Sequence, residues 1–162
     1  MHRDNDSGTT VASLLIDRTN KVFHAAWCGD SRLVHVSEEG KSNWASNDHN
    51  PNRVDEAAAI RERGGTIVMG KMYRNGIYED ISRVNSNQQD YQLAVSRAIG
   101  DHPWKKKKEG EFDILSAIPE QFTGELESKN SFIIACDGLV RLITSLPKSI
   151  IGQNARFCLL IV

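Results

Sequence analysis

Three strand-like runs follow one another near the start of the chain, with short polar turns between them. The runs are TVASLLI, KVFHAAWC and RLVHVS, at residues 10–16, 21–28 and 32–37. β-Branched and aromatic residues favour strands, and the stretch DRTN between the first two runs is typical of a hairpin turn. The third run closes at EEGK, residues 38–41, which also has turn composition. This order of runs and turns predicts an antiparallel meander.

The apolar period changes to that of a helix in NPNRVDEAAAIRERGG, residues 50–65. Asn52 is a suitable N-cap, and Gly64 is a suitable C-terminal stop. Four apolar residues can share one face of this predicted helix, namely Val54, Ala57, Ala58 and Ile60. This stretch is the clearest helix signal in the chain.

Strand-like composition returns after the predicted helix. TIVM, residues 66–69, predicts a strand, whereas Tyr73 to Gln92 is polar and predicts a loop. QLAVSRAIGD and FDILSAIPEQF, at residues 92–101 and 112–122, again have a β pattern. We therefore expect a protein in which strands outnumber helices.

Length and charge limit the classes of partner. The 162 residues suit one domain, and the formal net charge of −1 gives no general attraction to nucleic acid or anionic membranes. The first residues, MHRDNDSGTT, are polar, and the apolar run FCLLIV near the end is too short to span a bilayer. We expect a single domain over residues 1–162 in an intracellular protein, cytoplasmic or nuclear or both and not secreted, with no nucleic-acid or membrane partner.

The cysteines and lysines add two expectations. Cys28, Cys136 and Cys158 are odd in number and lack the spacing of a metal site. We expect them to be small buried residues in a reducing compartment, which argues against zinc. The run KKKK at residues 105–108 fits a nucleic-acid contact or a localisation signal, but the chain as a whole is not basic, so a solvated loop is favoured.

An aspartate directly follows the most apolar strand-like run. FIIAC, residues 132–136, is apolar at every step and predicts a buried strand, and Gly138 then allows a sharp turn. Asp137 at such a strand end either caps a turn or binds a hard cation such as Mg2+ or Mn2+. The residues that follow, LVRLITSL at 139–146, predict a short helix ended by Pro147.

Six short motifs occur along the chain in one order. They are SGTT at 7–10, CGDSR at 28–32, DHNP at 48–51, GG at 64–65, AVSRAIGD at 94–101 and ACDGL at 135–139. Each is weak alone, but their order and spacing together resemble the metal-dependent protein serine/threonine phosphatases of type 2C. The resemblance runs from about residue 7 to residue 139, and residues 140–162 form a divergent C-terminal tail.

The resemblance implies an α+β fold. The family's fold is a four-layer α-β-β-α sandwich of two antiparallel sheets flanked by helices, and we expect it to be incomplete at both ends of this chain. The antiparallel strands predicted from the residues agree with that fold.

The resemblance also implies a site for two Mg2+ or Mn2+ ions. Asp137 and Gly138 match the family's metal-binding Asp-Gly, and Asp30 matches an aspartate associated with a further, weaker metal site. Gln153 stands where the family has a metal-binding aspartate, so it is a degenerate ligand position. From its own context, Asp30 equally fits the cap of a tight Gly-Asp-Ser turn.

Other motif residues match the family without an expected catalytic role. Ser7 to Thr10, Arg97 and Asp101 are expected to pack and to hold turns. The family uses a metal-bound water rather than a side chain as its nucleophile, so no catalytic side chain is assigned. No substrate-binding residue is assigned either.

The family hydrolyses phosphoserine and phosphothreonine in proteins with two divalent cations. Its Asp-Gly-His-Gly motif, which supplies an aspartate that bridges both metals, is expected before Ser7, where this chain has MHRDND. Arg141 also replaces a carboxylate close to Asp137. We therefore expect a family member that is inactive or severely impaired, with a phosphoprotein substrate or a protein partner.

Three functions stay open at this point. An active phosphatase would need the missing ligands from another chain or from a longer product. A pseudophosphatase would keep the sandwich and use residues 48–92 as a partner surface. A truncated product would fold poorly. The number of available metal ligands favours the second and third of these.

Overall fold

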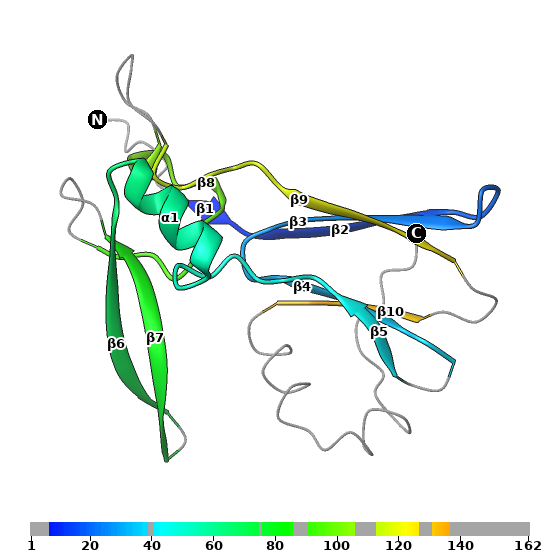
Figure 1. The fold of residues 1–162 in the computed structure, drawn as a ribbon, viewed down its shortest axis with the longest axis horizontal. Coiled ribbons are helices and arrows are strands. Elements are labelled where there is room, and N and C mark those ends of the chain that lie inside the picture. Colours follow the sequence, from blue (N-terminus) through cyan, green and yellow to red (C-terminus); the bar gives the residue numbers. More distant parts are fainter. Residues whose placement is uncertain are drawn as a thin grey trace. The chain divides into compact units, whose positions relative to one another are not determined.

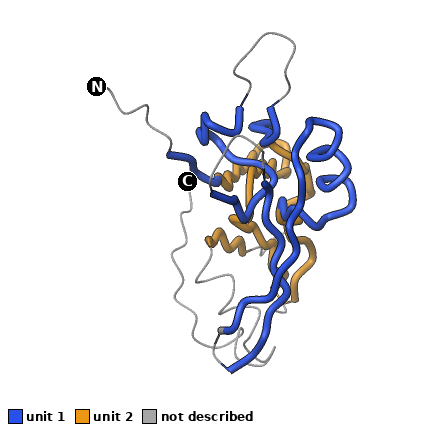
Figure 2. The backbone as a smooth tube through the Cα atoms, turned by 90° about the vertical axis from the view of Figure 1, so that its left-hand side faces the viewer, with its two compact units in different colours: residues 1–10, 49–118 blue, residues 11–48, 119–162 orange. Residues whose placement is uncertain are grey.

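The computed structural model describes residues 7–38, 41–74, 76–85, 91–105, 113–126 and 131–136. These residues divide into two compact units, one within residues 1–10 and 49–118 and the other within 11–48 and 119–162 (Figure 2). Each unit contains its own antiparallel sheets (Figure 1). No helix in the described ranges has the length and apolar character needed to cross a bilayer.

The unit within residues 11–48 and 119–162 contains two antiparallel three-stranded sheets. The first has the strand order β2-β3-β9, formed by Val11–Asp17, Val22–Cys28 and Glu120–Glu125. The second has the order β10-β4-β5, formed by Ser131–Ala135, Arg32–Val36 and Ser42–Ala45. All of these pairings are antiparallel.

The predicted hairpin at the start of the chain is confirmed, but the predicted meander is wrong beyond it, because β4 lies in the other sheet and pairs with β10 and β5 instead of β3. β2 pairs with β3 from Val11 opposite Cys28 to Asp17 opposite Val22. The carboxylate of Asp17 closes the turn, because its Oδ1 accepts hydrogen bonds from the backbone N–H groups of Thr19 and Asn20 at 3.0 and 2.9 Å. Local turn chemistry and strand propensity therefore agree here with the tertiary structure.

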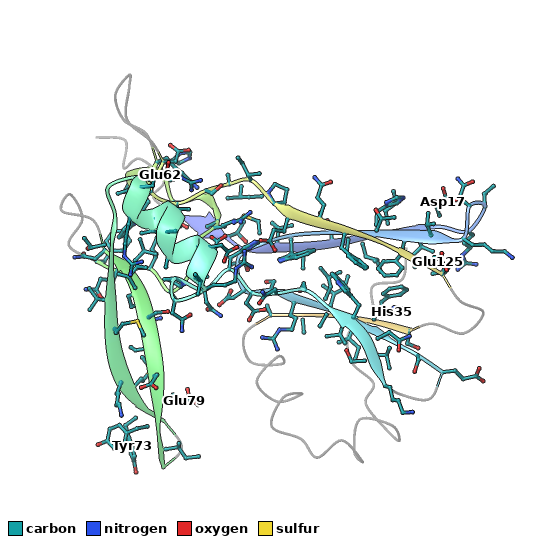
Figure 3. The ribbon with its side chains drawn as sticks, in the orientation of Figure 1. Asp17, His35, Glu62, Tyr73, Glu79 and Glu125 are labelled. Carbon is teal, nitrogen blue, oxygen red and sulfur yellow. The ribbon has the colours of Figure 1, made fainter. Side chains whose placement is uncertain are left out.

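The two sheets pack face to face around the ring of Phe23, which is 1% exposed. Its centroid lies 5.1 Å from that of His35 on β4 and 4.8 Å from that of Phe132 on β10, both in edge-on arrangements. Figure 3 shows His35 pointing into the space between the sheets. Trp27 on β3 adds a further edge-on contact with Trp44 on β5, at 5.5 Å.

The other unit combines one helix with short strands and a long hairpin. Its elements are β1 (Gly8–Thr9), α1 (Val54–Glu62), β6 (Thr66–Arg74), β7 (Ile77–Asn85), β8 (Ile99–Gly100) and the 3-10 helix η1 (His102–Trp104). β1 pairs with β8, and β6 pairs with β7. Its core consists of Ile60, Val84, Val95, Ala98, Trp104 and Leu115.

The predicted helix is present, but two details of its prediction are wrong. The N-cap residue is Arg53 rather than Asn52, and it makes no side-chain cap. Val54 is 86% exposed and Ala58 is also exposed, whereas Ala57 and Ile60 are buried. The buried stripe is therefore narrower than the apolar pattern suggested, because β6 and the core of this unit cover only the side of α1 that carries Ala57 and Ile60. Its predicted end holds, since Gly64 follows the helix with φ of 84°.

The loop predicted for residues 73–92 is wrong over most of its described part. Residues 77–85 form β7, which pairs with β6 along nine residue pairs. The misleading signal was the polar composition, because both faces of the outer part of this hairpin are exposed and need no apolar alternation. Conversely, the β pattern predicted for residues 92–101 reduces to β8 and two isolated bridges, Val84 with Leu93 and Arg97 with Ser116.

The described residues agree with the coarse fold prediction. They contain antiparallel sheets, two of which pack as a sandwich. In the ranges that the structure describes, α1 is the one α-helix, so the flanking helical layers stay a prediction. The short helix predicted at residues 139–146 lies outside the described residues.

Replacing the central ring tests this core. Phe23→Ala should lower the free energy of unfolding by about 3–5 kcal/mol, because it leaves a cavity between two sheets. Urea unfolding followed by tryptophan fluorescence measures the change. Leu15→Ala is the matched control, since Leu15 is 65% exposed on the outer face of the same sheet and its loss should cost about 0.5 kcal/mol. Equal costs for the two variants would contradict this assignment of the core.

Candidate functional site

Asp30 lies at one end of the β10-β4-β5 sheet. β10 runs antiparallel to β4 with Ala135 opposite Arg32, so β10 ends where β4 begins. Asp30 precedes β4 by two residues and is half-buried. Gly29, directly before it, has φ of 104°, a conformation that disfavours other residues. The backbone therefore turns sharply between β3 and β4 and brings Asp30 to the end of the sheet at which β10 finishes.

A paired cation lies beside Asp30. Arg32 donates two hydrogen bonds to the carboxylate of Asp48, from Nε to Oδ1 at 2.9 Å and from Nη2 to Oδ2 at 2.7 Å. The hydrogen bond to Asp48 raises the pKa of Arg32, burial opposes this, and the charges of Asp48 and Asp30 add to the rise. The DHNP and CGDSR motifs thus meet through a bidentate ion pair. Asp48 is engaged with Arg32 and neutralises most of its charge next to Asp30.

The segment that carries Asp48 is fixed by further hydrogen bonds. The indole Nε1 of Trp27 donates to the carbonyl oxygen of Asn47 at 2.9 Å. The backbone N–H of Leu33 donates to Oγ of Ser46 at 2.9 Å, and the N–H of Ser46 donates to the carbonyl of Leu33 at the same distance. The position of Asp48 relative to β4 is therefore held by the backbone as well as by its own carboxylate.

Three of the predicted metal-site residues lie outside the described residues. These are Asp137, Gly138 and Gln153, and Arg141 lies outside them as well. Of the predicted metal ligands, Asp30 is the one within the described ranges. The structure therefore describes the sheet end that precedes Asp137, up to Cys136.

Arg97 of AVSRAIGD joins three segments of its unit. Its Nε and Nη2 donate to Oε1 of Glu56 on α1, at 2.9 and 2.5 Å, and its Nη1 donates to the carbonyl oxygen of Ile118 at 2.9 Å. Arg53 also donates to Oε1 of Glu56, at 3.0 Å. Glu56 is 5% exposed, so one buried carboxylate lies between two guanidinium groups. This arrangement is a structural clamp, as expected for a packing role of Arg97.

Asp101 lies against the segment that contains β1 and helps to hold β1 beside β8. Asp101 has φ of 50°, and its N–H donates to the carbonyl oxygen of Ser7 at 3.1 Å. A Cβ on Gly8 would overlap the Asp101 carboxyl, so SGTT and AVSRAIGD fit closely. Burial raises the pKa of Asp101, although the charges of Lys105 and His102 oppose the rise.

Two features of this unit were missed from the sequence. The first is Glu56, which lies four residues before Ile60 on the buried stripe of α1, and an acidic residue on an apolar stripe was a usable signal. The second is Lys105, whose Nζ donates to the carbonyl oxygens of Ala98 and Leu115 at 3.0 and 2.7 Å. The solvated-loop interpretation is wrong for Lys105, which is half-buried, while residues 106–108 lie outside the described ranges.

The prediction of buried cysteines holds for one residue and fails for another. Cys28 at the end of β3 is buried, whereas Cys136 at the end of β10 is exposed. Cys136 follows the last paired residue of its strand, so the apolar run continues past the sheet that would cover it. Cys158 lies outside the described residues.

Comparison with known sequences gives one consistent result. A sequence model of the family described as Protein phosphatase 2C matches residues 1–146. Human Protein phosphatase 1G is 38% identical over 144 residues, which cover 87% of this chain and 23% of the relative. Protein phosphatase 2C homolog 2 of Schizosaccharomyces pombe is 34% identical over 142 residues, covering 86% of this chain and 33% of the relative. The chain thus spans about a quarter to a third of the length of these relatives.

Comparison with solved structures gives the same fold. A serine-threonine phosphatase 2C from Toxoplasma gondii superposes with a TM-score of 0.63 at 21% identity, over 83% of this chain and 42% of that chain. A Caenorhabditis elegans sex determining protein superposes with a TM-score of 0.59 at 27% identity, over 83% of this chain and 28% of that chain.

The clamp around Glu56 makes stability depend on pH in a defined direction. Burial raises the pKa of the Glu56 carboxyl, but hydrogen bonds from Arg97 and Ser96, together with the charges of Arg97 and His49, outweigh burial and hold the pKa below its usual value. A carboxyl whose pKa is lower in the folded state stabilises that state above the ordinary value of about 4.3, and this stabilisation is lost as pH falls through the folded pKa.

Glu56→Gln should therefore lower the free energy of unfolding by roughly 3 kcal/mol at pH 7, because it leaves the guanidinium of Arg97 without its carboxylate and removes one of the two carboxylates that pair with Arg53. The difference from the unaltered chain should shrink at pH 3, as measured by urea unfolding at both values. Asp55→Asn is the control, since Asp55 is an exposed neighbour that also pairs with Arg53 and should cost less than about 1 kcal/mol. A pH-independent cost for Glu56→Gln would contradict the ion-pair explanation.

Proposed function

The chain belongs to the protein phosphatase 2C family, and on that premise we propose that it carries the scaffold of a metal-dependent protein serine/threonine phosphatase while these 162 residues, taken alone, are inactive or severely impaired. The family chemistry is hydrolysis of phosphoserine and phosphothreonine in proteins. The observation that carries the proposal is the sheet end at Asp30, where β10 finishes opposite Arg32 and Asp137 follows in the sequence.

The proposed metal site uses the ends of β4 and β10. Asp137 with Gly138 would follow the end of β10, and Asp30 precedes β4 at the same end of the sheet. Mg2+ or Mn2+ bound there would supply Lewis acidity and an activated water. The ion pair of Arg32 with Asp48 favours cation binding at Asp30, because Asp48 offsets the positive charge that would otherwise repel the ion.

The described residues alone do not complete a two-metal centre. Mg2+ and Mn2+ prefer about six oxygen ligands, several of them carboxylates, and Asp30 is the one proposed ligand in the described part of the chain. The sequence holds one Asp-Gly pair, Asp137-Gly138, and Gln153 offers a neutral carbonyl oxygen where the family has a carboxylate. We therefore assign no catalytic step to this chain.

We also propose that residues 1–162 belong to one domain with the family's four-layer α-β-β-α architecture, in which residues 140–162 form a divergent tail. One family model extends over residues of both compact units, which supports a single domain. The face-to-face sheets around Phe23 would be the two inner β layers.

The alternative function is that of a pseudophosphatase, a binding module for a protein partner. The hairpin β6–β7 favours this alternative, because it exposes aromatic and aliphatic side chains along its outer half. This hairpin lies within residues 48–92, the stretch proposed as a partner surface. Such a module would bind a protein without needing the missing carboxylates.

Catalysis by the isolated chain tests the proposal. We expect no Mn2+-dependent hydrolysis of a phosphothreonine peptide above background, and no change on Asp137→Asn, because too few oxygen ligands are present to hold a metal pair. Titration of Mn2+ followed by electron paramagnetic resonance should show weak binding that Asp30→Asn weakens further.

The matched control for metal binding is Asp113→Asn, which removes one carboxylate from the other unit and should leave Mn2+ binding unchanged. Robust turnover that Asp137→Asn abolishes would overturn the proposed impairment. Mn2+ binding that is unaffected by Asp30→Asn would remove Asp30 from the site.

A further inference from the structure

One edge of β6 carries backbone groups that bond to no other residue in the described ranges. Ile67 lies opposite Val84 in the hairpin, and the N–H and C=O of Val84 point away from β6, because both bond to Leu93. Backbone direction alternates along an antiparallel pair, so every second residue of β6 also directs its N–H and C=O outward. These residues include Met69, Lys71 and Tyr73, whose outward groups meet no hydrogen-bonding partner among the described residues.

The opposite edge of the hairpin shows that an extended segment can add to it. Val84 N–H donates to the carbonyl oxygen of Leu93 at 2.8 Å, and Leu93 N–H donates to the carbonyl oxygen of Val84 at 3.1 Å. A residue from another segment thus already pairs with β7 in antiparallel fashion. The same geometry is available on β6 over residues 69–73.

Exposed apolar side chains concentrate on this hairpin. Half of the large hydrophobic side chains that are exposed in the described part of the chain lie on β6 and β7, namely Val68, Met69, Tyr73, Ile77 and Tyr78. The rings of Tyr73 and Tyr78 contact each other with centroids 5.0 Å apart. Figure 3 shows Tyr73 at the end of the hairpin away from α1. Such a concentration of apolar surface marks an interaction site.

The side chains beside this edge define the chemistry of its occupant. Met69, Lys71 and Tyr73 direct their side chains to one face of the hairpin, since successive side chains of a strand alternate between faces. Met69 is 58% and Tyr73 is 64% exposed, and Lys71 between them is also exposed. A strand added here would place three of its own side chains opposite these residues. Lys71 has Asp80 opposite it on β7, and an acidic residue of the added strand would complement Lys71 from the other side.

We propose that the edge of β6 from Met69 to Tyr73 binds an extended segment of a partner protein as an added β-strand, with an acidic residue opposite Lys71 between two apolar residues that face Met69 and Tyr73. Backbone hydrogen bonds supply affinity, and the alternate side chains supply specificity. This docking surface does not depend on phosphoester hydrolysis and serves either an enzyme or a pseudophosphatase.

Two observations favour this occupant and this edge over a second copy of the chain and over the edge of β7. A second copy of the chain, paired symmetrically about Lys71 to use the whole edge, would set two ammonium groups opposite each other. The edge of β7 offers less room, because Ser82 is buried and Val84 is already paired with Leu93. Asp80 would also repel an acidic segment at that edge.

The test uses the unaltered 162-residue chain and a labelled, capped peptide, STVTETFTS, with binding followed by fluorescence anisotropy. Its Val, Glu and Phe would lie opposite β6, and their N–H groups would point at the edge. N-Methylation of any of these three residues should weaken binding at least tenfold. N-Methylation of the two Thr residues that flank Glu should leave binding unchanged, because their N–H groups point away.

Charge variants test the side-chain part. Lys71→Glu should weaken binding of the peptide about fivefold, and a peptide with Lys in place of Glu should recover it. Lys41→Glu makes the same charge change directly before β5, in the other unit, and should leave peptide binding unchanged. Far-ultraviolet circular dichroism confirms that each variant is folded.

Equal losses from both sets of N-methylated peptides, or no loss from either set, would overturn strand addition. Tighter binding with Asp80→Lys together with unchanged binding with Lys71→Glu would place the peptide on β7 and overturn the assignment to β6. Sedimentation as a dimer that Lys71→Glu disrupts would show a second copy as the occupant and would also overturn the proposal. All of these readouts measure binding, so they are independent of whether the chain hydrolyses phosphopeptides.

Discussion

Burial of the Phe23 ring between two sheets is the interaction on which the sandwich depends. The residues around this ring are far apart in the sequence. His35 lies near the start of the described chain, whereas Phe122 and Phe132 lie near its end. Removing the ring from water therefore requires β9 and β10 to return and pair with β3 and β4. The same pairing sets the end of β10 opposite Arg32 and beside Asp30.

The arrangement of segments in the other unit depends on hydrogen bonds made by charged side chains that are buried or half-buried. Glu56 pairs with Arg97 and Arg53, and Lys105 donates to two backbone carbonyl oxygens, so both of these charged side chains have partners. These contacts explain why family-like residues such as Arg97 need no place in catalysis. Their role is to hold α1 and the AVSRAIGD segment in one arrangement.

The hairpin β6–β7 combines a fixed base with an open outer half. Ile67 and Val84 pack against the core of their unit, and this anchors a two-stranded sheet that would be marginal alone. Beyond them the side chains are largely exposed, so core packing gives no reason for Tyr73 and Tyr78 to be aromatic. Tyr73 and Tyr78 lie opposite each other and their rings contact, which stabilises the end of the hairpin. Their exposed surface would also serve the binding function proposed for residues 48–92.

The sequence by itself determined the first hairpin, the helix and its end at Gly64, and the family, because these follow from local turn chemistry, apolar period and the order of short motifs. It could not determine that Lys105 is half-buried, that β7 is a strand, or that Val54 is exposed, because each depends on what lies beside the residue rather than on its neighbours in sequence. The pairing of Arg32 with Asp48 and of Arg97 with Glu56 was decided by the tertiary structure, since a charge finds its partner through space.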